Sequence, residues 1–226
     1  MCRIDDSAQY AYTACNDGAV QLIFGPNGGA PRTVDEAELI ELYRLPAPEG
    51  RGWLRTNFVM SLDGSVQGPD GRSGTINTPS DQHVFALQRS LADAILVGAN
   101  TVRFEGYRAV DLEPLRAAGI TVLEAEATIL DLALIVDQLA GTGLPRLLCE
   151  GGPRLHNDLL AAGVVDEVAL TLAPVVVGGQ GLRSTSGAAL PVPNSFQLHH
   201  VLYADDGALF TTYRVKSGLS DRARLG

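Results

Sequence analysis

The stretch 146–155 constrains the fold more than any other part of this sequence. A short apolar run ends there in Glu150 and the pair Gly151-Gly152, and a helical pattern follows directly. A strand that stops at glycines and continues as a helix is typical of α/β proteins, so the stretch indicates an α/β fold. The free backbone N–H groups at such a turn can bind phosphate, although the same turn often only reverses the chain; the residues alone leave both interpretations open.

A second unit of this kind follows the apolar run 94–98, which has the length and composition of a strand covered on both faces. Thr101 opens the segment after it and marks a second candidate anion site. The other predicted strands are 53–60, 120–123, 144–149 and 165–174. A predicted hairpin is formed by 196–203 and 208–215 around Asp205-Asp206-Gly207. The predicted helices are 112–119, 129–139 and 154–162.

Two further helices are predicted from their first residues. Thr33, with Glu36 three residues later, predicts a capping box for a helix over 34–43. Thr78 followed by Pro79 predicts a second helix start, and an apolar stripe with helical spacing continues from there to Leu91. Arg89 lies off this stripe, and by itself it predicts a solvated arginine.

Charge and composition exclude several classes of function. The net charge is −9 and there is no run of basic residues, which argues against a nucleic-acid partner. No apolar stretch is long enough for a membrane span or a signal core, so we expect no membrane partner and a cytoplasmic protein. Lys216 is the only lysine, which disfavours Schiff-base chemistry, and the four histidines lack metal-ligand spacing, so no metal site is expected.

Composition also suggests how the chain is divided. Residues 1–50 are acidic and contain Pro46 and Pro48 near their end, which predicts an N-terminal extension. Residues 51–216 carry the regular pattern of strands and helices and form the predicted main domain. Residues 217–226 are polar and predict a loose tail.

The sequence lacks G-x-S-x-G, a Walker lysine and H-E-x-x-H, which removes the commonest nucleophile and metal mechanisms. What remains is a set of glycine- and threonine-rich turns, a carboxylate at a strand end, and arginines that can grip phosphate bidentately. This combination favours a site that binds a phosphorylated nucleotide cofactor beside an anionic substrate. In such a site the cofactor carries the chemistry.

Several motifs in fixed order, from about Trp53 to Val215, resemble those of the reductase domain of riboflavin biosynthesis. They are 53–64, the loop and cap 73–81, 94–101, Glu150-Gly-Gly-Pro, 164–167 and Ala173-Pro174. The resemblance implies a dihydrofolate-reductase-like fold of the α/β class: a central, mostly parallel twisted sheet flanked by helices, with a C-terminal antiparallel hairpin. It also implies a homodimer.

The resemblance further implies reduction of the ribosyl group of 5-amino-6-(5-phosphoribosylamino)uracil to a ribityl chain with NADPH. The family's substrate contacts fall on Ser73, Arg89 and Glu150; Arg89 would bind the phosphate and Glu150 would lie near the pyrimidine or the ribose. This reverses the interpretation of Arg89 as a solvated residue. The family's NADPH contacts fall on Val59, Thr75, Thr101, Gly151 and Gly152.

The reaction is hydride delivery to C1′ of an opened or imine form of the sugar, and its rate would come mainly from holding the two reacting groups close together. Asp63 and Glu105 are the acidic candidates for organising protons. For Asp63 the alternative of a turn residue that bonds local backbone is at least as strong.

Three departures from the family pattern bear on function. Asn57 stands where some bifunctional members carry lysine, and Glu105 stands where aspartate is usual. The chain between Tyr107 and Ile120 is shorter by roughly a strand-turn-strand, so we expect that residues are missing from the printed sequence near Arg108 to Leu112. An intact mass near 23.8 kDa would contradict that expectation.

Two alternatives to the pyrimidine reductase stay open at this point: the same fold and cofactor acting on a pterin such as dihydrofolate, or a nucleotide-binding protein without catalysis. The zinc-deaminase signatures H-x-E and P-C-x-x-C do not occur in the sequence, so at most the reductase half is expected.

Overall fold

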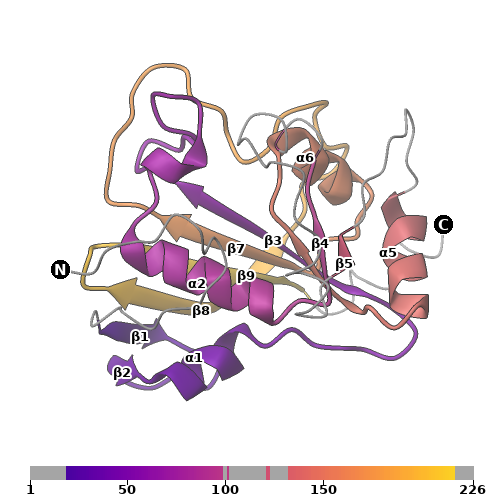
Figure 1. The fold of residues 1–226 in the computed structure, drawn as a ribbon, viewed down its shortest axis with the longest axis horizontal. Coiled ribbons are helices and arrows are strands. Elements are labelled where there is room, and N and C mark those ends of the chain that lie inside the picture. The colour runs from indigo at the N-terminus through magenta and orange to yellow at the C-terminus, as the bar shows by residue number, and fades with distance from the viewer. Residues whose placement is uncertain (1–18, 99–100, 102–120, 123–131, 217–226) are drawn as a thin grey trace.

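The computed structural model describes residues 19–98, 101, 121–122 and 132–216. Its strands form a nine-stranded sheet in the order β2-β1-β8-β9-β7-β3-β6-β4-β5 (Figure 1). The strands are β1 (Val20–Phe24), β2 (Arg32–Val34), β3 (Trp53–Met60), β4 (Ala94–Leu96), β5 (Thr121–Val122), β6 (Arg146–Cys149), β7 (Glu167–Leu172), β8 (Phe196–Ala204) and β9 (Leu209–Val215).

The sheet has a parallel half and an antiparallel half. Strands β7, β3, β6, β4 and β5 run parallel to one another, whereas β9, β8, β1 and β2 continue the sheet with antiparallel pairings. The β8–β9 hairpin pairs with β7 and joins the two halves. The predicted α/β sheet with a C-terminal antiparallel hairpin is therefore confirmed, and the sheet is mixed: four of its pairings are parallel and four are antiparallel.

Helices cover both faces of the sheet. The short helix α1 (Glu36–Tyr43) and the longer α2 (Pro79–Ser90) lie on one face, whereas α5 (Leu132–Gly141) and α6 (Pro153–Ala161) lie on the other (Figure 1). Side chains of β3 alternate between the faces: Arg55 and Asn57 point to the α2 face, and Thr56 points to the α6 face. We use "α2 face" and "α6 face" for these two sides.

Apolar packing fills the space between the sheet and each helical layer. Strand β3 lies between β7 and β6 and is buried along most of its length, although Arg55, Thr56 and Asn57 stand in its middle. The largest buried clusters are Val20, Leu22, Val34, Leu39, Tyr43, Val84, Leu87, Leu202, Ala204, Ala208 and Phe210 on the α2 face, and Leu54, Ala94, Val136, Leu139, Leu147, Cys149, Leu159, Leu160, Val164, Val165 and Val168 around α5 and α6.

The start of α2 matches the sequence prediction and has a further cap. The Thr78 side chain accepts a hydrogen bond from the Asp81 N–H at 3.1 Å, and Pro79 occupies the first turn. The Ser80 N–H donates to Asp206, at the tip of the β8–β9 hairpin, at 2.9 Å. The hairpin thus satisfies a helix end that comes 126 residues earlier in the chain.

The predicted helix over 34–43 is wrong at its start. Thr33 pairs with Gln21 in the β1–β2 ladder, so it cannot cap a helix. Helix α1 begins at Glu36, and Asp35 is its N-cap, accepting from the Glu38 N–H at 2.9 Å. Strands β1 and β2 themselves were not predicted. They extend the same sheet through β8, whereas the division of the chain at residue 50 stays a prediction.

The remaining predicted elements differ from the structure mainly at their ends. Strand β4 stops at Leu96, and β5 covers 121–122 of the predicted 120–123. Helix α5 is described from 132 to 141 and ends two residues beyond the predicted end at 139. Residues 129–131 and the predicted helix 112–119 lie outside the described residues. None of the helices in the described segments has the length and apolar character to cross a membrane.

Candidate active site

The candidate site lies where the parallel strands end. The loop after β3 and the long loop after β7 lie side by side there, above the sheet in Figure 1. The Leu62 N–H donates to the Val175 carbonyl and the Val66 N–H donates to the Leu182 carbonyl, each at 2.8 Å. These bonds join two loops more than 100 residues apart into one rim at the carboxyl ends of the strands, where α/β sheets commonly bind ligands.

The Gly151-Gly152 turn forms the second wall of this site and requires glycine at both positions. Gly151 has φ +88, and a Cβ on it would lie 3.0 Å from the Phe58 ring. A Cβ on Gly152 would lie 2.5 Å from Thr101 Oγ1. The Gly98 N–H donates to the Gly151 carbonyl at 2.7 Å. The structure therefore brings together three residues predicted to contact the cofactor: Thr101, Gly151 and Gly152.

The first turn of α6 leads directly from these glycines. Gly152 is its N-cap and supplies no side-chain acceptor, so the local sequence offers backbone donors without a side chain to occupy them. His156, one turn into the helix, contacts Thr56 Oγ1 at 3.2 Å and the Ser184 carbonyl at 2.9 Å. Burial lowers the pKa of His156, so the ring is neutral at pH 7 and ties β3, α6 and the loop after β7 together.

Arg89 and Glu150 form a bidentate ion pair across the α2 face. Arg89 Nε lies 2.5 Å from Glu150 Oε1, and Arg89 Nη2 lies 2.6 Å from Glu150 Oε2. The guanidinium also stacks over the Phe85 ring, with 4.3 Å from Cζ to the ring centroid. Both residues were predicted as substrate contacts with separate roles, and the structure shows that they contact each other. The forked edge of Arg89 is engaged by Glu150.

A second pair lies next to this one and was not predicted as part of the site. Gln88 Nε2 donates to Asn57 Oδ1 at 3.0 Å, and both side chains are buried. The sequence contains one sign of it: Gln88 follows Leu87 on the buried side of α2, where an apolar residue is expected.

The remaining predicted ligand contacts lie in the loop that follows β3. Val59 is buried against Ile76 and Ala173, so its side chain belongs to the core. The Thr75 hydroxyl donates to Asp70 at 2.9 Å, and a Cβ on Gly68 would lie 1.8 Å from Thr75 Oγ1.

Ser73 begins the short helix η1 (Ser73–Thr75), and its carbonyl accepts from the Ile76 N–H at 3.0 Å. These contacts hold the loop in shape, and the predicted ligand roles of Ser73, Thr75 and Val59 stay predictions.

Asp63 links the two loops of the rim. Its carboxylate accepts from the Gly178 N–H at 2.7 Å, from the Val177 N–H at 3.2 Å and from the Ser61 hydroxyl at 2.6 Å. The Ser61 hydroxyl and the two backbone N–H groups lower the pKa of Asp63 to about 2. Asp63 is therefore ionised at pH 7. Glu105, the other predicted acid, lies outside the described residues.

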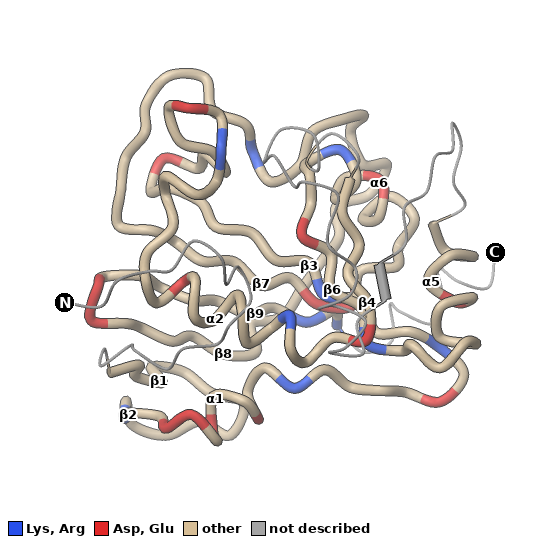
Figure 2. Tube along the Cα trace, viewed as in Figure 1, with Lys and Arg blue, Asp and Glu red and all other residues tan. Residues whose placement is uncertain are grey.

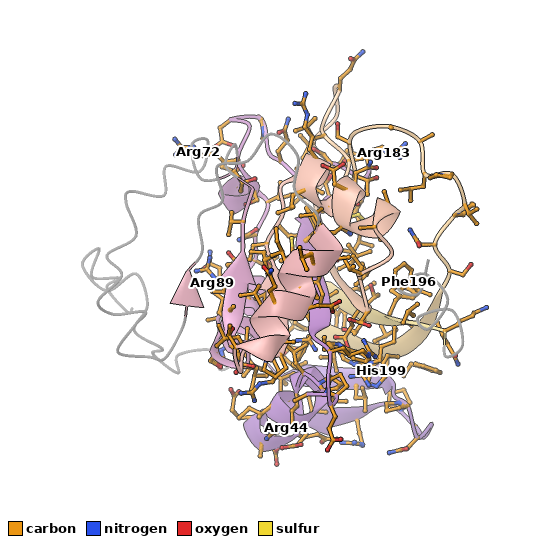
Figure 3. The ribbon with its side chains drawn as sticks, turned by 90° about the vertical axis from the view of Figure 1, so that its right-hand side faces the viewer. Arg44, Arg72, Arg89, Arg183, Phe196 and His199 are labelled. Carbon is orange, nitrogen blue, oxygen red and sulfur yellow. The ribbon has the colours of Figure 1, made fainter. Side chains whose placement is uncertain are left out.

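Basic side chains stand on the loops of this edge. Figure 3 labels Arg72 and Arg183 at the loop end of the molecule, Arg89 nearer the middle and Arg44 at the opposite end. In Figure 2, both acidic and basic segments are marked on these loops, and further acidic segments are marked on α1. An anionic ligand at the strand ends would therefore meet arginines that stand among carboxylates.

Comparison with known proteins points to one family. Residues 52–118 and 109–210 match the family model described as the RibD C-terminal domain, and the two matches overlap in the segment where the sequence predicts a shortening. The 2,5-diamino-6-ribosylamino-4(3H)-pyrimidinone 5′-phosphate reductase of Methanothermobacter thermautotrophicus is 27% identical over 180 residues, which cover 59% of this chain and 83% of that protein. The RibD protein of Mycobacterium tuberculosis is 27% identical over 54% of this chain and 42% of its own length.

Solved structures share the fold. A pyrimidine reductase-like protein from Corynebacterium diphtheriae has a TM-score of 0.56 at 21% identity, covering 73% of this chain and 92% of that one. The riboflavin biosynthesis reductase Rib7 of Saccharomyces cerevisiae has a TM-score of 0.58 at 16% identity, covering 81% of this chain and 100% of that one. These likenesses confirm the predicted reductase-type fold.

Proposed function

Since the chain belongs to the RibD C-terminal domain family, we propose that it is an NADPH-dependent reductase that converts the ribosyl group of a phosphoribosylamino-pyrimidine to a ribityl chain. The observation that carries the proposal is the contact between Arg89 and Glu150 directly beside the Gly151-Gly152 turn. One residue step along the chain separates a charge-paired carboxylate from a glycine turn that leads into α6 without a side-chain cap. This arrangement suits two ligands held side by side.

The glycine turn fits the phosphates of a dinucleotide. Gly152 leaves the start of α6 without a side-chain cap, and Arg183 lies on the neighbouring loop that His156 anchors through Ser184. Thr101 and Gly151 complete the wall, and Val59 and Thr75 are the further contacts that the resemblance implies. NADPH would supply the hydride. The chain's own part is to hold the cofactor at the strand ends and to keep water out of the reacting region.

The substrate would lie on the α2 face of the same edge. Ser73, Arg89 and Glu150 are the proposed contacts, with the phosphate attracted by arginine and the pyrimidine or ribose bound near Glu150. Because Glu150 engages Arg89 through two hydrogen bonds, we propose that Arg89 also fixes the direction of the carboxylate. Asp63 is ionised and bound by backbone N–H groups, which supports a role in shaping the loops more than one in proton donation.

The experiment is an assay of NADPH oxidation with purified protein. It compares 5-amino-6-(5-phosphoribosylamino)uracil, the 2,5-diamino pyrimidinone named for the archaeal relative, and dihydrofolate. We expect turnover with one or both phosphoribosylamino-pyrimidines and none with dihydrofolate. Turnover with dihydrofolate alone would contradict the substrate class. NADPH binding without turnover of any of the three would favour the non-catalytic alternative.

Assembly and location are part of the same proposal. We propose a cytoplasmic homodimer with a phosphorylated small molecule as its substrate. The resemblance supports the dimer, and light scattering at several protein concentrations measures it. A monomer mass at every concentration would contradict it.

A further inference from the structure

Two consecutive residues of α2 reach two neighbouring strands of the sheet. Gln88 donates to Asn57 of β3, and Arg89 binds Glu150, which follows β6. In the β3–β6 ladder Thr56 pairs with Cys149, so Asn57 and Glu150 are the next residues of two parallel strands. Successive residues of parallel strands in register lie side by side on the same face. The amide pair is therefore adjacent to the ion pair at the proposed substrate site.

Gln88 occupies a position that packing alone would give to an apolar residue. Its neighbours Val84 and Leu87 belong to the core of the α2 face, and Gln88 itself is only 1% exposed. Burying a side-chain amide costs free energy unless all its polar atoms find partners. Gln88 Oε1 has no hydrogen-bond partner in the described chain. The position thus keeps a costly polar group, which points to a role beyond packing.

The direction of the hydrogen bond determines what Asn57 presents. Because Gln88 Nε2 is the donor, it engages Asn57 Oδ1 and leaves Asn57 Nδ2 as the other end of the amide. Within the described residues this nitrogen makes no hydrogen bond, and it is not among the buried side-chain atoms that lack a partner. Asn57 is 8% exposed as a whole, and we infer that Nδ2 is the end of its side chain that faces the strand ends. A ligand at the strand ends can reach it.

We propose that Gln88 is a positioning residue that holds the Asn57 amide with its N–H donor toward the substrate. Asn57 then offers a donor, and Glu150 beside it offers carboxylate oxygens that can each accept a second hydrogen bond. A donor next to an acceptor complements an amide-like edge, in which a carbonyl oxygen stands beside an N–H, as in a pyrimidinone ring. This inference rests on the proposed function, and it adds that Gln88, through Asn57, determines how the pyrimidine ring is bound.

The test reverses the polarity of the amide pair. In Gln88→Glu the ionised carboxylate cannot donate, so it would accept from Asn57 Nδ2 and turn the donor away from the substrate. We expect KM for the phosphoribosylamino-pyrimidine to rise about 10-fold at pH 8, while the Kd for NADPH stays unchanged. As the pH falls toward 5 the buried carboxyl regains its proton and can donate again, so the KM ratio of variant to wild type should narrow.

Two further variants separate positioning from packing. Gln82→Glu adds the same charge at an exposed position of α2 and should leave KM unchanged at every pH. Gln88→Leu suits the apolar surroundings and cannot donate, so it should raise KM without the narrowing at low pH.

The outcomes distinguish this inference from the proposed function. Suppose that the wild-type protein reduces the pyrimidine and that both Gln88 variants have a KM within about twofold of the wild-type KM. Such a difference is smaller than the loss of one hydrogen bond produces. This result overturns the inference about Gln88 and leaves the proposed function standing. A raised KM in Gln88→Glu that does not change with pH also overturns it. A wild-type protein that turns over no phosphoribosylamino-pyrimidine overturns the proposed function and this inference together.

Discussion

The α2 face carries two clusters of arginine and glutamate with opposite surroundings. At the strand ends, Arg89 and Glu150 form a bidentate pair in which the Arg89 side chain is 17% exposed. Toward the start of the parallel strands, Glu167 of β7 accepts from Arg55 of β3 at 2.5 Å and from Arg214 of β9 at 2.8 Å. Arg55 and Glu167 are fully buried, and Arg55 Nη1 and Nη2 have no hydrogen-bond partner in the described chain.

We expect the buried Arg55–Glu167 pair to serve stability and the Arg89–Glu150 pair to serve a ligand. Arg55 and Glu167 are enclosed by Tyr43 and three strands, and only Arg214, with a side chain that is 28% exposed, connects this cluster to solvent. Removing a partner there leaves a buried charge uncompensated. The Arg89–Glu150 pair stands beside a glycine turn and loops that solvent reaches. Its loss should act on ligand binding more than on folding.

The largest expected effect is on the closed cluster. Glu167→Gln removes the carboxylate shared by two arginines and should lower the free energy of unfolding by about 3–5 kcal/mol in urea titrations. Glu41→Gln breaks the exposed pair with Arg44 and should leave the urea midpoint close to that of the wild type. A Glu167 variant as stable as the Glu41 variant would remove the distinction between the two clusters.

The next effect concerns activity. Arg89→Ala leaves Glu150 without its bidentate partner and should lower kcat/KM for the pyrimidine by about 30-fold, equivalent to about 2 kcal/mol. Arg146→Ala is the matched control, because Arg146 makes a bidentate pair with Asp93 at the other end of β6. That variant should keep kcat/KM near the wild-type value. Equal losses in the two variants would mean that Arg89 acts through stability alone.

The smallest effect is local and depends on pH. The folded-state pKa of Asp63, about 2, lies below its ordinary value of 3.8, so its hydrogen bonds to the loop are complete above pH 4 and are lost as the pH falls toward 2. At pH 5 Asp63→Asn should lower the hydrogen-exchange protection of the Gly178 amide by about 10-fold.

As the pH falls through about 2, the difference between the wild type and the Asp63 variant in exchange at Gly178 should narrow. Asp70→Asn, in the neighbouring loop, serves as the control and should leave the Gly178 amide unchanged. Protection of the Gly178 amide that does not depend on Asp63 at pH 5 would show that the rim is held together by its backbone contacts alone.

Local signals predict much of this molecule. Strand β3 was predicted with its observed bounds because a strand pattern ends there at the turn residues Asp63-Gly64. The predicted start of α2 at Thr78-Pro79 and the predicted β8–β9 hairpin are also confirmed. A helix cap and a hairpin turn each depend on a few adjacent residues, so the sequence alone can reveal them.

Contacts between distant segments account for what was missed. Strand β1 is stable as a strand because β8 pairs with it, and no feature within residues 20–24 reveals that partner. Asn57 and Gln88 are 31 residues apart, and their contact depends on how α2 crosses the sheet. The Asp63 contact to Gly178 spans 115 residues. The resemblance identified Arg89 and Glu150 as site residues but could not show that they bind each other.

The order of the strands also has a consequence for the newly made chain. Strand β1 pairs with β8, and the start of α2 is capped by Asp206, so both early segments depend on the last fifth of the sequence. At about 5–20 residues per second, roughly 10 to 40 s separate the synthesis of β1 from that of β8. During that time β1 and β2 form at most an isolated two-stranded hairpin, which is barely stable in water. The antiparallel half of the sheet therefore assembles only after β8 and β9 have been made, and a ribosome stalled before residue 196 would hold an incomplete sheet with an open edge.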